Sequence, residues 1–283
     1  MNRYKTPTAL RRALEDRLLA AVRRDGGDIQ RMRRQAAFDR LLCRLFREPD
    51  APWLLKGGYA MELRIHAART TRDVDLAIRT LPTEKWNDAA IRNLLESAAS
   101  VDLQDGFEFT IGAPTMDLDA APYGGSRFPV EAQMAGRRFA NFHVDVSAGD
   151  VLREPFEMLE GQDWLGFAGI AKAKLPAISR EEQFAEKLHA YTLPRTGRPN
   201  TRVKDLVDMI LLSDSGAMDR TRLAENIKAT FRRRGTHDVP QSLPSPQDSW
   251  AEPFSALADE CGLNKNMTEH HRRLADFLTE ILK

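Results

Sequence analysis

Several features are scarce in this sequence, and each absence excludes a class of protein. The 283 residues include only 2 cysteines, Cys43 and Cys261, which lie far apart and form no C-x-x-C pair. We therefore expect neither a disulfide framework nor a zinc-cysteine site. No run approaches the roughly 18 consecutive apolar residues that a membrane-spanning helix needs, and the charged N-terminus lacks the apolar core of a secretory signal. We expect a cytoplasmic protein with no membrane partner.

An excess of one charge is also missing from the chain as a whole. Lys and Arg number 42 and Asp and Glu number 41, which argues against a surface that is positive everywhere. The distribution is uneven, because residues 1–50 carry 13 Lys and Arg against 7 Asp and Glu. This basic N-terminal segment permits a phosphate-bearing partner without requiring one.

The hydrophobic spacing predicts helices first and a mixed region after them. Residues 8–24 and 29–47 repeat apolar side chains at helical intervals, so residues 1–50 form a basic helical N-terminal segment. Residues 51–165 then read as an α/β core. We expect strands over 53–56, 73–78, 107–113, 129–134 and 137–149, a turn near Ala135-Gly136, and a helix over 83–99 capped by Thr83.

After Ala168 the strand patterns stop, and residues 166–283 are expected to form a helical C-terminal domain. Ser179 followed by Glu182 has the form of a capping box that starts a helix. Further helices are predicted over 202–213, 219–233 and 267–282, with a loop before the last one.

Two aspartates lie inside the apolar strand pattern "DVDLAI". Side chains alternate along a strand, so Asp73 and Asp75 point to the same side, about 6.6 to 6.8 Å apart at the backbone. Two carboxylates in this arrangement suit a hard cation such as Mg²⁺, which prefers oxygen ligands and often binds together with substrate phosphates. An edge strand with solvated aspartates explains this short pattern equally well.

A second strand pattern, "FHVDVSAGD", contributes a third carboxylate. Its apolar and polar residues alternate, and Asp145 lies on the polar face with His143 and Ser147. If the two strands are neighbours, three carboxylates converge, and their mutual repulsion calls for a cation. Such a set would hold two metal ions about 3.5–4 Å apart, which activate an attacking hydroxyl and stabilise a leaving pyrophosphate.

A glycine pair precedes these aspartates at a predicted strand-to-helix junction. Without side chains, Gly57 and Gly58 would let backbone amides approach a phosphate at the start of a helix, and Lys56 would add positive charge. An ordinary tight turn is the alternative. The pattern is neither a Walker A loop nor a G-x-G-x-x-G fingerprint.

In this order, the glycine turn, the D-x-D pair and the later carboxylate resemble the signature of the DNA polymerase β-like nucleotidyltransferase superfamily. The string "KGG…RTTRDVDL" resembles more narrowly the AbiEii-type nucleotidyltransferase toxins of type IV toxin–antitoxin systems. Their R-x-[ST]-x-D-x-D pattern is matched by Arg69, Thr71, Asp73 and Asp75.

Two later segments extend the resemblance. "EEQFAEKLHAY" is similar to the helix that carries the family's A-E-K motif, with Lys187 as its functional lysine. "RPNTRVKDLVDMILL" is similar to the following R…K-D-x-x-D helix, with Asp205 and Asp208 at the acidic positions. The matched motifs lie within residues 54–212, and the segments on either side match none.

The resemblance implies an α+β fold, with a nucleotidyltransferase-type mixed β-sheet core between a short helical segment and a helical C-terminal domain. It also implies transfer of a nucleoside monophosphate from an NTP with Mg²⁺ or Mn²⁺, most naturally to the 3′ end of tRNA, which blocks growth until an antitoxin encoded nearby intervenes. The expected catalytic residues are Asp73, Asp75, Asp145, Lys187 and Asp205, with the first three as metal ligands. The expected nucleotide-binding residues are Lys56, Gly57, Gly58, Arg69, Thr71, Lys187 and Asp208.

Two alternatives stay open on the sequence alone. The acceptor could be a small molecule, as in antibiotic-modifying nucleotidyltransferases, or a protein. The chain could instead be an interaction protein with a degenerate site. A basic run of Arg195, Arg198, Arg202 and Lys204 would suit an RNA backbone, and a solvated helix face explains it equally well.

Overall fold

The structure is a computed structural model that describes residues 3–65, 67–118, 121–195, 197, 199–216 and 218–283. Its internal contacts divide the chain into two compact units. The first comprises Met1–Leu63, Thr70–Gly149 and Glu157–Ala177, and the second comprises Arg64–Arg69, Asp150–Phe156 and Ile178–Lys283. The three parts expected from the sequence, 1–50, 51–165 and 166–283, remain a prediction.

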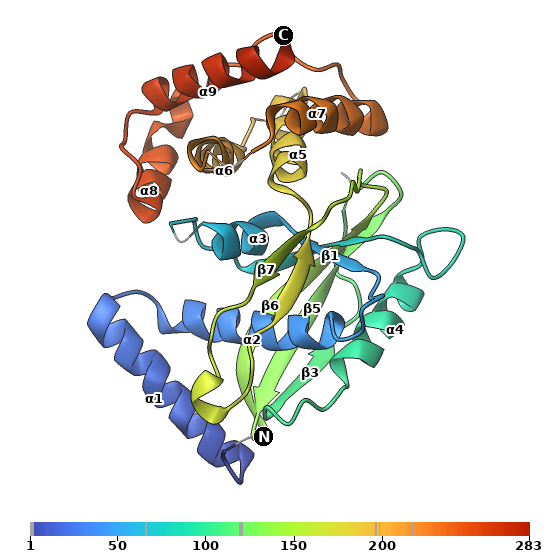
Figure 1. Cartoon of the computed structure of the whole chain (residues 1–283), viewed down its shortest axis with the longest axis vertical. Helices are drawn as coiled ribbons and strands as arrows, with labels where there is room; N and C mark the ends of the chain where they lie inside the picture. Colours follow the sequence, from blue (N-terminus) through green and yellow to red (C-terminus); the bar gives the residue numbers. More distant parts are fainter. Residues whose placement is uncertain (1–2, 66, 119–120, 196, 198, 217) are drawn as a thin grey trace. The chain divides into compact units, whose positions relative to one another are not determined.

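Among the described residues, the first unit is built on a mixed sheet of eight strands (Figure 1). The order is β3-β5-β6-β2-β1-β8-β7, with β4 attached to β5. Strands β2 and β6 are parallel, as are β1 and β8, and the other neighbours are antiparallel. The strands span Trp53–Lys56 (β1), Asp73–Ile78 (β2), Phe107–Ile111 (β3), Met116–Asp117 (β4), Gly125–Met134 (β5), Arg137–Ala148 (β6), Glu157–Glu160 (β7) and Lys174–Ala177 (β8).

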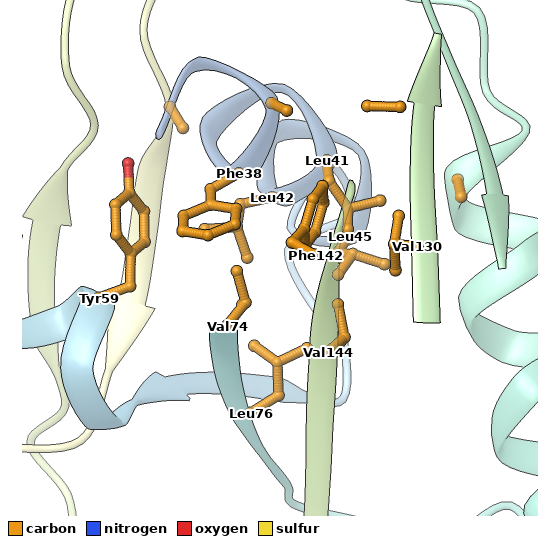
Figure 2. Close-up of a cluster of buried hydrophobic side chains, with 14 of the residues drawn as sticks. Phe38, Leu41, Leu42, Leu45, Tyr59, Val74, Leu76, Val130, Phe142 and Val144 are labelled. Atoms are coloured by element: carbon orange, nitrogen blue, oxygen red, sulfur yellow. The ribbon is translucent and has the colours of Figure 1, made fainter. Parts of the chain in front are cut away.

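One face of this sheet is covered by α2, and the contact sets the register of the strands. The rings of Phe38 on α2 and Phe142 on β6 meet edge to face, with centroids 4.8 Å apart. Val74 and Val144 are fully buried in the same cluster (Figure 2). A one-residue slip would turn these side chains away from the core, so their burial fixes which residues point to the opposite face. Helices of this unit are α1 (Pro7–Asp25), α2 (Ile29–Leu45), α3 (Gly57–Arg64) and α4 (Asp88–Ala99).

The second unit is helical in the part that the structure describes. Its helices are α5 (Arg180–Thr192), α6 (Val203–Asp214), α7 (Arg220–Arg234), α8 (Ala251–Cys261) and α9 (Met267–Leu282). The predicted capping box is present at the start of α5, where the Ser179 hydroxyl accepts from the Glu182 amide at 3.2 Å and the Glu182 carboxylate accepts from the Ser179 amide at 3.4 Å. The predicted α+β class is confirmed. In the described ranges, no helix is long and apolar enough to cross a membrane.

Three local predictions were wrong. The helix α4 starts at Asp88, not near Thr83, because Asn87 is the cap and its side chain accepts from the Ala90 amide at 3.0 Å. Strands continue past Ala168, since the four-residue β8 pairs in parallel with β1. The helix α8 begins within the expected loop; its Pro253 lies in the first turn, where a missing N–H breaks no helical hydrogen bond.

Candidate active site

A row of charged residues crosses four neighbouring strands of the first unit. Lys56 on β1 is paired with Asp75 on β2, Asp75 with Asp145 on β6, and Asp145 with Arg127 on β5. Directly paired residues point to the same face of a sheet. The row therefore places two carboxylates side by side between two basic residues.

A second row lies two residues further along the same face. Asp73 on β2 is paired with His143 on β6, and the His143 Nδ1 lies 3.1 Å from the Asp73 Oδ1. The strands that carry the aspartates are therefore parallel neighbours. This is the condition under which the three carboxylates were expected to converge. The buried faces of these strands, with Val74 and Val144, hold the carboxylates on the opposite side.

The sequence did not single out Arg127, which lies among these carboxylates. Its Nε donates to the Asp145 Oδ1 at 2.8 Å, and its Nη2 donates to the Asp145 Oδ2 at 2.7 Å. The same Nη2 also reaches the Asp73 Oδ2 at 3.3 Å. The hydrogen bonds to Asp145 raise the pKa of Arg127 above its ordinary value. A fixed positive charge therefore already lies where the sequence predicted that a cation would be needed.

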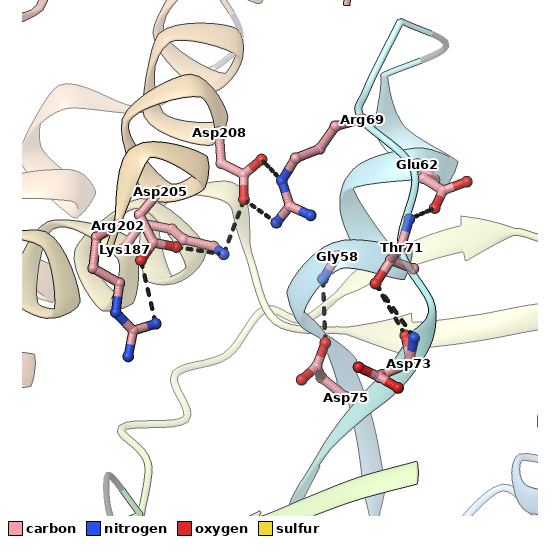
Figure 3. A network of polar contacts seen from close by, with 10 residues as sticks. All are labelled: Gly58, Glu62, Arg69, Thr71, Asp73, Asp75, Lys187, Arg202, Asp205 and Asp208. Carbon is pink, nitrogen blue, oxygen red and sulfur yellow. Dashed lines mark hydrogen bonds and ion pairs between the residues drawn. The ribbon is translucent and has the colours of Figure 1, made fainter. Parts of the chain in front are cut away.

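The glycine turn packs directly against Asp75. Gly57 has φ +64°, and a Cβ added there would overlap the Asp75 carboxylate. The Gly58 amide donates to the Asp75 Oδ2 at 3.3 Å (Figure 3), and a Cβ on Gly58 would lie 2.7 Å from the Thr71 hydroxyl oxygen. Both glycines are needed for this close approach between the start of α3 and the acidic strand.

Thr71 fixes the entry into β2. The Thr71 amide donates a hydrogen bond to the Glu62 Oε1 at 2.5 Å. The Thr71 hydroxyl oxygen accepts a hydrogen bond from the Asp73 amide at 3.5 Å (Figure 3). Burial raises the pKa of Glu62, and its other oxygen accepts from Gln35. The threonine therefore orients Asp73 through the backbone.

In the second unit, four of the predicted residues form one ion-pair network (Figure 3). Arg69 donates from Nε and Nη2 to the two oxygens of Asp208, at 2.9 and 2.8 Å. The Lys187 Nζ lies 2.9 Å from an oxygen of Asp205 and 2.9 Å from an oxygen of Asp208. Arg202 also reaches Asp205, at 3.5 Å.

Lys187 keeps its charge despite its burial. Burial opposes the ammonium form, but Asp205 and Asp208 outweigh it and raise the pKa of Lys187 above its ordinary value. Asp208 is fully buried, and its neighbours Lys187 and Arg69 hold its pKa below the usual value against the effect of burial. Both acids therefore orient the lysine, and Asp208 also holds Arg69.

Each unit brings one group of the predicted site residues together. The first unit holds Lys56, Gly57, Gly58, Thr71, Asp73, Asp75 and Asp145, and the second holds Arg69, Lys187, Asp205 and Asp208. In the basic run, Arg198 lies outside the described residues, and Arg202 is engaged by Asp205.

The donor set suits a hard divalent cation in part. Asp73 and Asp75 offer carboxylate oxygens on one face, which is the chemistry that Mg²⁺ prefers. Within the described ranges, however, no three His, Cys, Asp or Glu residues are grouped so that they could hold a metal ion. Asp145 has both carboxylate oxygens bound by Arg127. A cation at Asp145 would therefore compete with this guanidinium for the carboxylate.

Comparison with known families identifies the class of enzyme. The family model described as nucleotidyl transferase AbiEii toxin, type IV TA system, matches residues 40–279. The chain belongs to this family. It is accordingly a nucleotidyltransferase, as the motifs predicted, and the AbiEii match begins before the first motif and ends well after the last one.

Solved structures share the fold of this AbiEii protein. MenT4, a nucleotidyltransferase toxin from Mycobacterium tuberculosis, matches with a TM-score of 0.55 and 17% identity over 95% of this chain and 99% of that one. A candidate nucleotidyltransferase from Helicobacter pylori matches with a TM-score of 0.50 and 15% identity over 90% and 97% of the two chains. A search of curated proteins gives no significant match.

Proposed function

We propose that this AbiEii-family enzyme transfers a nucleoside monophosphate from an NTP to the 3′ end of tRNA, with Mg²⁺ or Mn²⁺, and releases pyrophosphate. The observation that carries the proposal is the pairing of Asp75 with Asp145 beside Asp73, on a sheet face that adjoins a glycine turn. Carboxylates next to a helix start supply metal ligands and a phosphate-binding backbone within one site.

The contacts support a proposed role for each of these residues. Asp73 and Asp75 would hold the divalent cation, which would supply Lewis-acid activation of the phosphate and of the acceptor hydroxyl. Gly57 and Gly58 bring the start of α3 against Asp75, and the helix dipole there favours the negative charge of a phosphate. Asp145 completes the acidic site and, once released by Arg127, accepts the proton of the acceptor hydroxyl.

The proposed roles of the second-unit residues come from the resemblance of their motifs to the family. Lys187 neutralises the triphosphate, and Asp205 and Asp208 fix its ammonium group through the two 2.9 Å contacts. Arg69 is held by Asp208 and braces the segment that leads into Thr71. Lys56, beside Asp75, adds a further positive charge for the phosphates.

The biological outcome is proposed from family membership. Modification of the tRNA acceptor end in the cytoplasm would block translation and arrest growth, and a cognate antitoxin encoded nearby would counteract it. MenT4 is described as a nucleotidyltransferase toxin, and this supports a toxic role.

An acceptor competition tests the proposal. The purified chain is incubated with Mg²⁺ and each of the four α-labelled NTPs in turn, with total tRNA, with a protein mixture or with an aminoglycoside. Label in tRNA, lost on treatment with an enzyme that removes 3′-terminal nucleotides, is the expected result. Label found only in protein or only in the aminoglycoside would replace tRNA with that acceptor.

A further inference from the structure

A pocket of about 690 Å³ opens on the first unit beside the acidic rows. Its walls include Arg34, Arg72, Asp73, Asn141 and His143. A volume of this size lies within the range of about 300–1,000 Å³ that is typical of small-ligand sites, so it can hold a mononucleotide unit.

The strand pairing places part of the pocket lining on the acidic face of the sheet, whereas Val130 and Phe142, which also line the pocket, point to the face that α2 covers. Asp73 is paired with His143, and two residues further along β6, Asn141 is paired with Glu131 of β5. These positions share the face of Asp75 and Asp145 because side chains alternate. The β6 strand begins at Arg137 whereas β2 begins only at Asp73, opposite His143, so β6 extends beyond β2 at this point.

The pocket and the glycine turn lie on different sides of the aspartate pair. The turn contacts Asp75 through the Gly58 amide, whereas the pocket is lined by Asp73. Among the described residues that line the pocket, none comes from β1 or α3. If NTP phosphates lie at the turn, the pocket is open to the other reactant, the acceptor.

Two guanidinium groups at the pocket are not paired with carboxylates in the part of the chain that the structure describes. The Nε of Arg34 is buried without a hydrogen-bond partner, and Arg72 is exposed. By contrast, Arg127 is engaged by Asp145 and Asp73, and Glu131 accepts from Gln133. Guanidinium groups bind phosphate oxygens in a bidentate manner, whereas they repel a cationic acceptor such as an aminoglycoside.

We infer that this pocket binds the acceptor, and that Arg34 and Arg72 hold the phosphodiester next to the 3′-terminal hydroxyl of an RNA chain. The inference rests on the proposed function, because it assumes that the acidic rows carry out the transfer. The terminal ribose then lies between the phosphate held by the arginines and the carboxylate of Asp73. Arg34 and Arg72 are thereby substrate-positioning residues that select a phosphate-bearing acceptor.

The test compares two double variants of the full chain. Arg34→Gln with Arg72→Gln removes the pocket charges. Arg12→Gln with Arg23→Gln removes the same charge from exposed positions on α1, within the basic N-terminal segment but outside the pocket. Binding of 5′-labelled tRNA is measured without divalent metal over a range of salt concentrations, and binding of a fluorescent NTP analogue is measured separately.

The pocket variant is expected to bind tRNA at least ten-fold more weakly than wild type, and the control variant at most about two-fold more weakly. Two lost phosphate contacts lower the slope of log affinity against log salt by about 1.4 to 1.8. NTP affinity stays unchanged, which also shows that the pocket variant is folded. Equal losses in both variants, or a loss of NTP affinity instead, would overturn the inference.

The outcome of the acceptor competition separates this inference from the proposed function. If wild type labels tRNA but the pocket variant binds and labels tRNA normally, the pocket assignment is wrong and the function stands. If wild type labels only protein or an aminoglycoside, the tRNA assignment fails and the pocket assignment fails with it.

Discussion

Arg127 and Asp145 form a bidentate ion pair, in which Nε donates to Oδ1 at 2.8 Å and Nη2 donates to Oδ2 at 2.7 Å. The guanidinium also lies 3.3 Å from an oxygen of Asp73. The guanidinium therefore relieves the repulsion between the carboxylates. From the sequence alone, this neutralisation was expected to come from a metal ion. Metal binding at Asp145 and pairing with Arg127 are competing states of the same carboxylate.

Arg127→Met should therefore strengthen divalent metal binding. A unit charge about 4 Å away is worth about 1 kcal/mol in water and about 4 kcal/mol at an effective dielectric constant of 20, so the Mn²⁺ dissociation constant should fall about ten-fold. Electron paramagnetic resonance titration of Mn²⁺ measures it. Arg137→Met, at an exposed position on the same sheet, should leave the constant unchanged. Unchanged or weaker binding in Arg127→Met would mean that the guanidinium supports the metal site.

Gly57→Ala should abolish most transfer activity. The new Cβ must enter the space of the Asp75 carboxylate, at a residue with φ +64°. Gly136→Ala is the matched control, because Gly136 has φ +68° and no atom within 4 Å of an added Cβ. Both variants carry backbone strain of about 1–3 kcal/mol, but only Gly57→Ala should lose activity, at least ten-fold in kcat. Equal activity in the two variants would show that the close approach to Asp75 is dispensable.

Asp208→Asn should destabilise the chain more than Asp205→Asn. Asp208 is fully buried and neutralises both Arg69 and Lys187, and removing one partner from a buried ion pair typically costs about 3–5 kcal/mol. Asp205 shares Lys187 with Asp208, and its other partner, Arg202, is 43% exposed. Urea unfolding followed by circular dichroism compares the two variants. A larger loss of unfolding free energy in Asp205→Asn than in Asp208→Asn would contradict this prediction.

Asp39 should give the first unit a pH-dependent stability. Burial raises its pKa to about 6, and it accepts hydrogen bonds from the Tyr59 hydroxyl at 2.6 Å and the Gln162 amide at 2.8 Å. Because the folded pKa lies above the unfolded value of about 3.9, its contribution is fully present below pH 4 and is lost as the pH rises through 6. The shift corresponds to about 3 kcal/mol.

Asp39→Asn isolates this contribution, since asparagine does not titrate. The free energy of unfolding of wild type minus that of the variant should be about 3 kcal/mol larger at pH 4 than at pH 7.5, as measured by urea unfolding at both values. Groups that titrate in both proteins cancel in the difference. A difference that is constant, or larger at pH 7.5, would contradict the raised pKa.

The sequence predicted the features that depend on local periodicity. Alternation in "DVDLAI" and "FHVDVSAGD" correctly placed Val74 and Val144 in the core and the aspartates on the other face. The Ser179–Glu182 capping box was also predictable because its partners are three residues apart. The parallel pairing of β2 with β6 could not be predicted from the sequence and was only assumed, because many residues separate these strands.

Arg127 could not be located from the turn at Ala135-Gly136. Counting back from that turn along a regular hairpin pairs Arg127 with Val144, on the core side. A bulge between Ala132 and Gln133 shifts the register by one residue and brings Arg127 opposite Asp145. The short strand β8 was missed for a related reason, since four residues that include Pro176 show too little alternation to indicate a strand.

The central claim is that the carboxylates on β2 and β6 carry out nucleotidyl transfer. Its most direct test is the initial rate of label transfer from an α-labelled NTP to tRNA by wild type, Asp75→Asn and Asp117→Asn, the last at an exposed position on β4. Loss of one group that stabilises charge in the transition state lowers the rate by about 100- to 1,000-fold, so Asp75→Asn should be slower by a factor in this range while Asp117→Asn matches wild type. Transfer by Asp75→Asn at the wild-type rate would contradict the account.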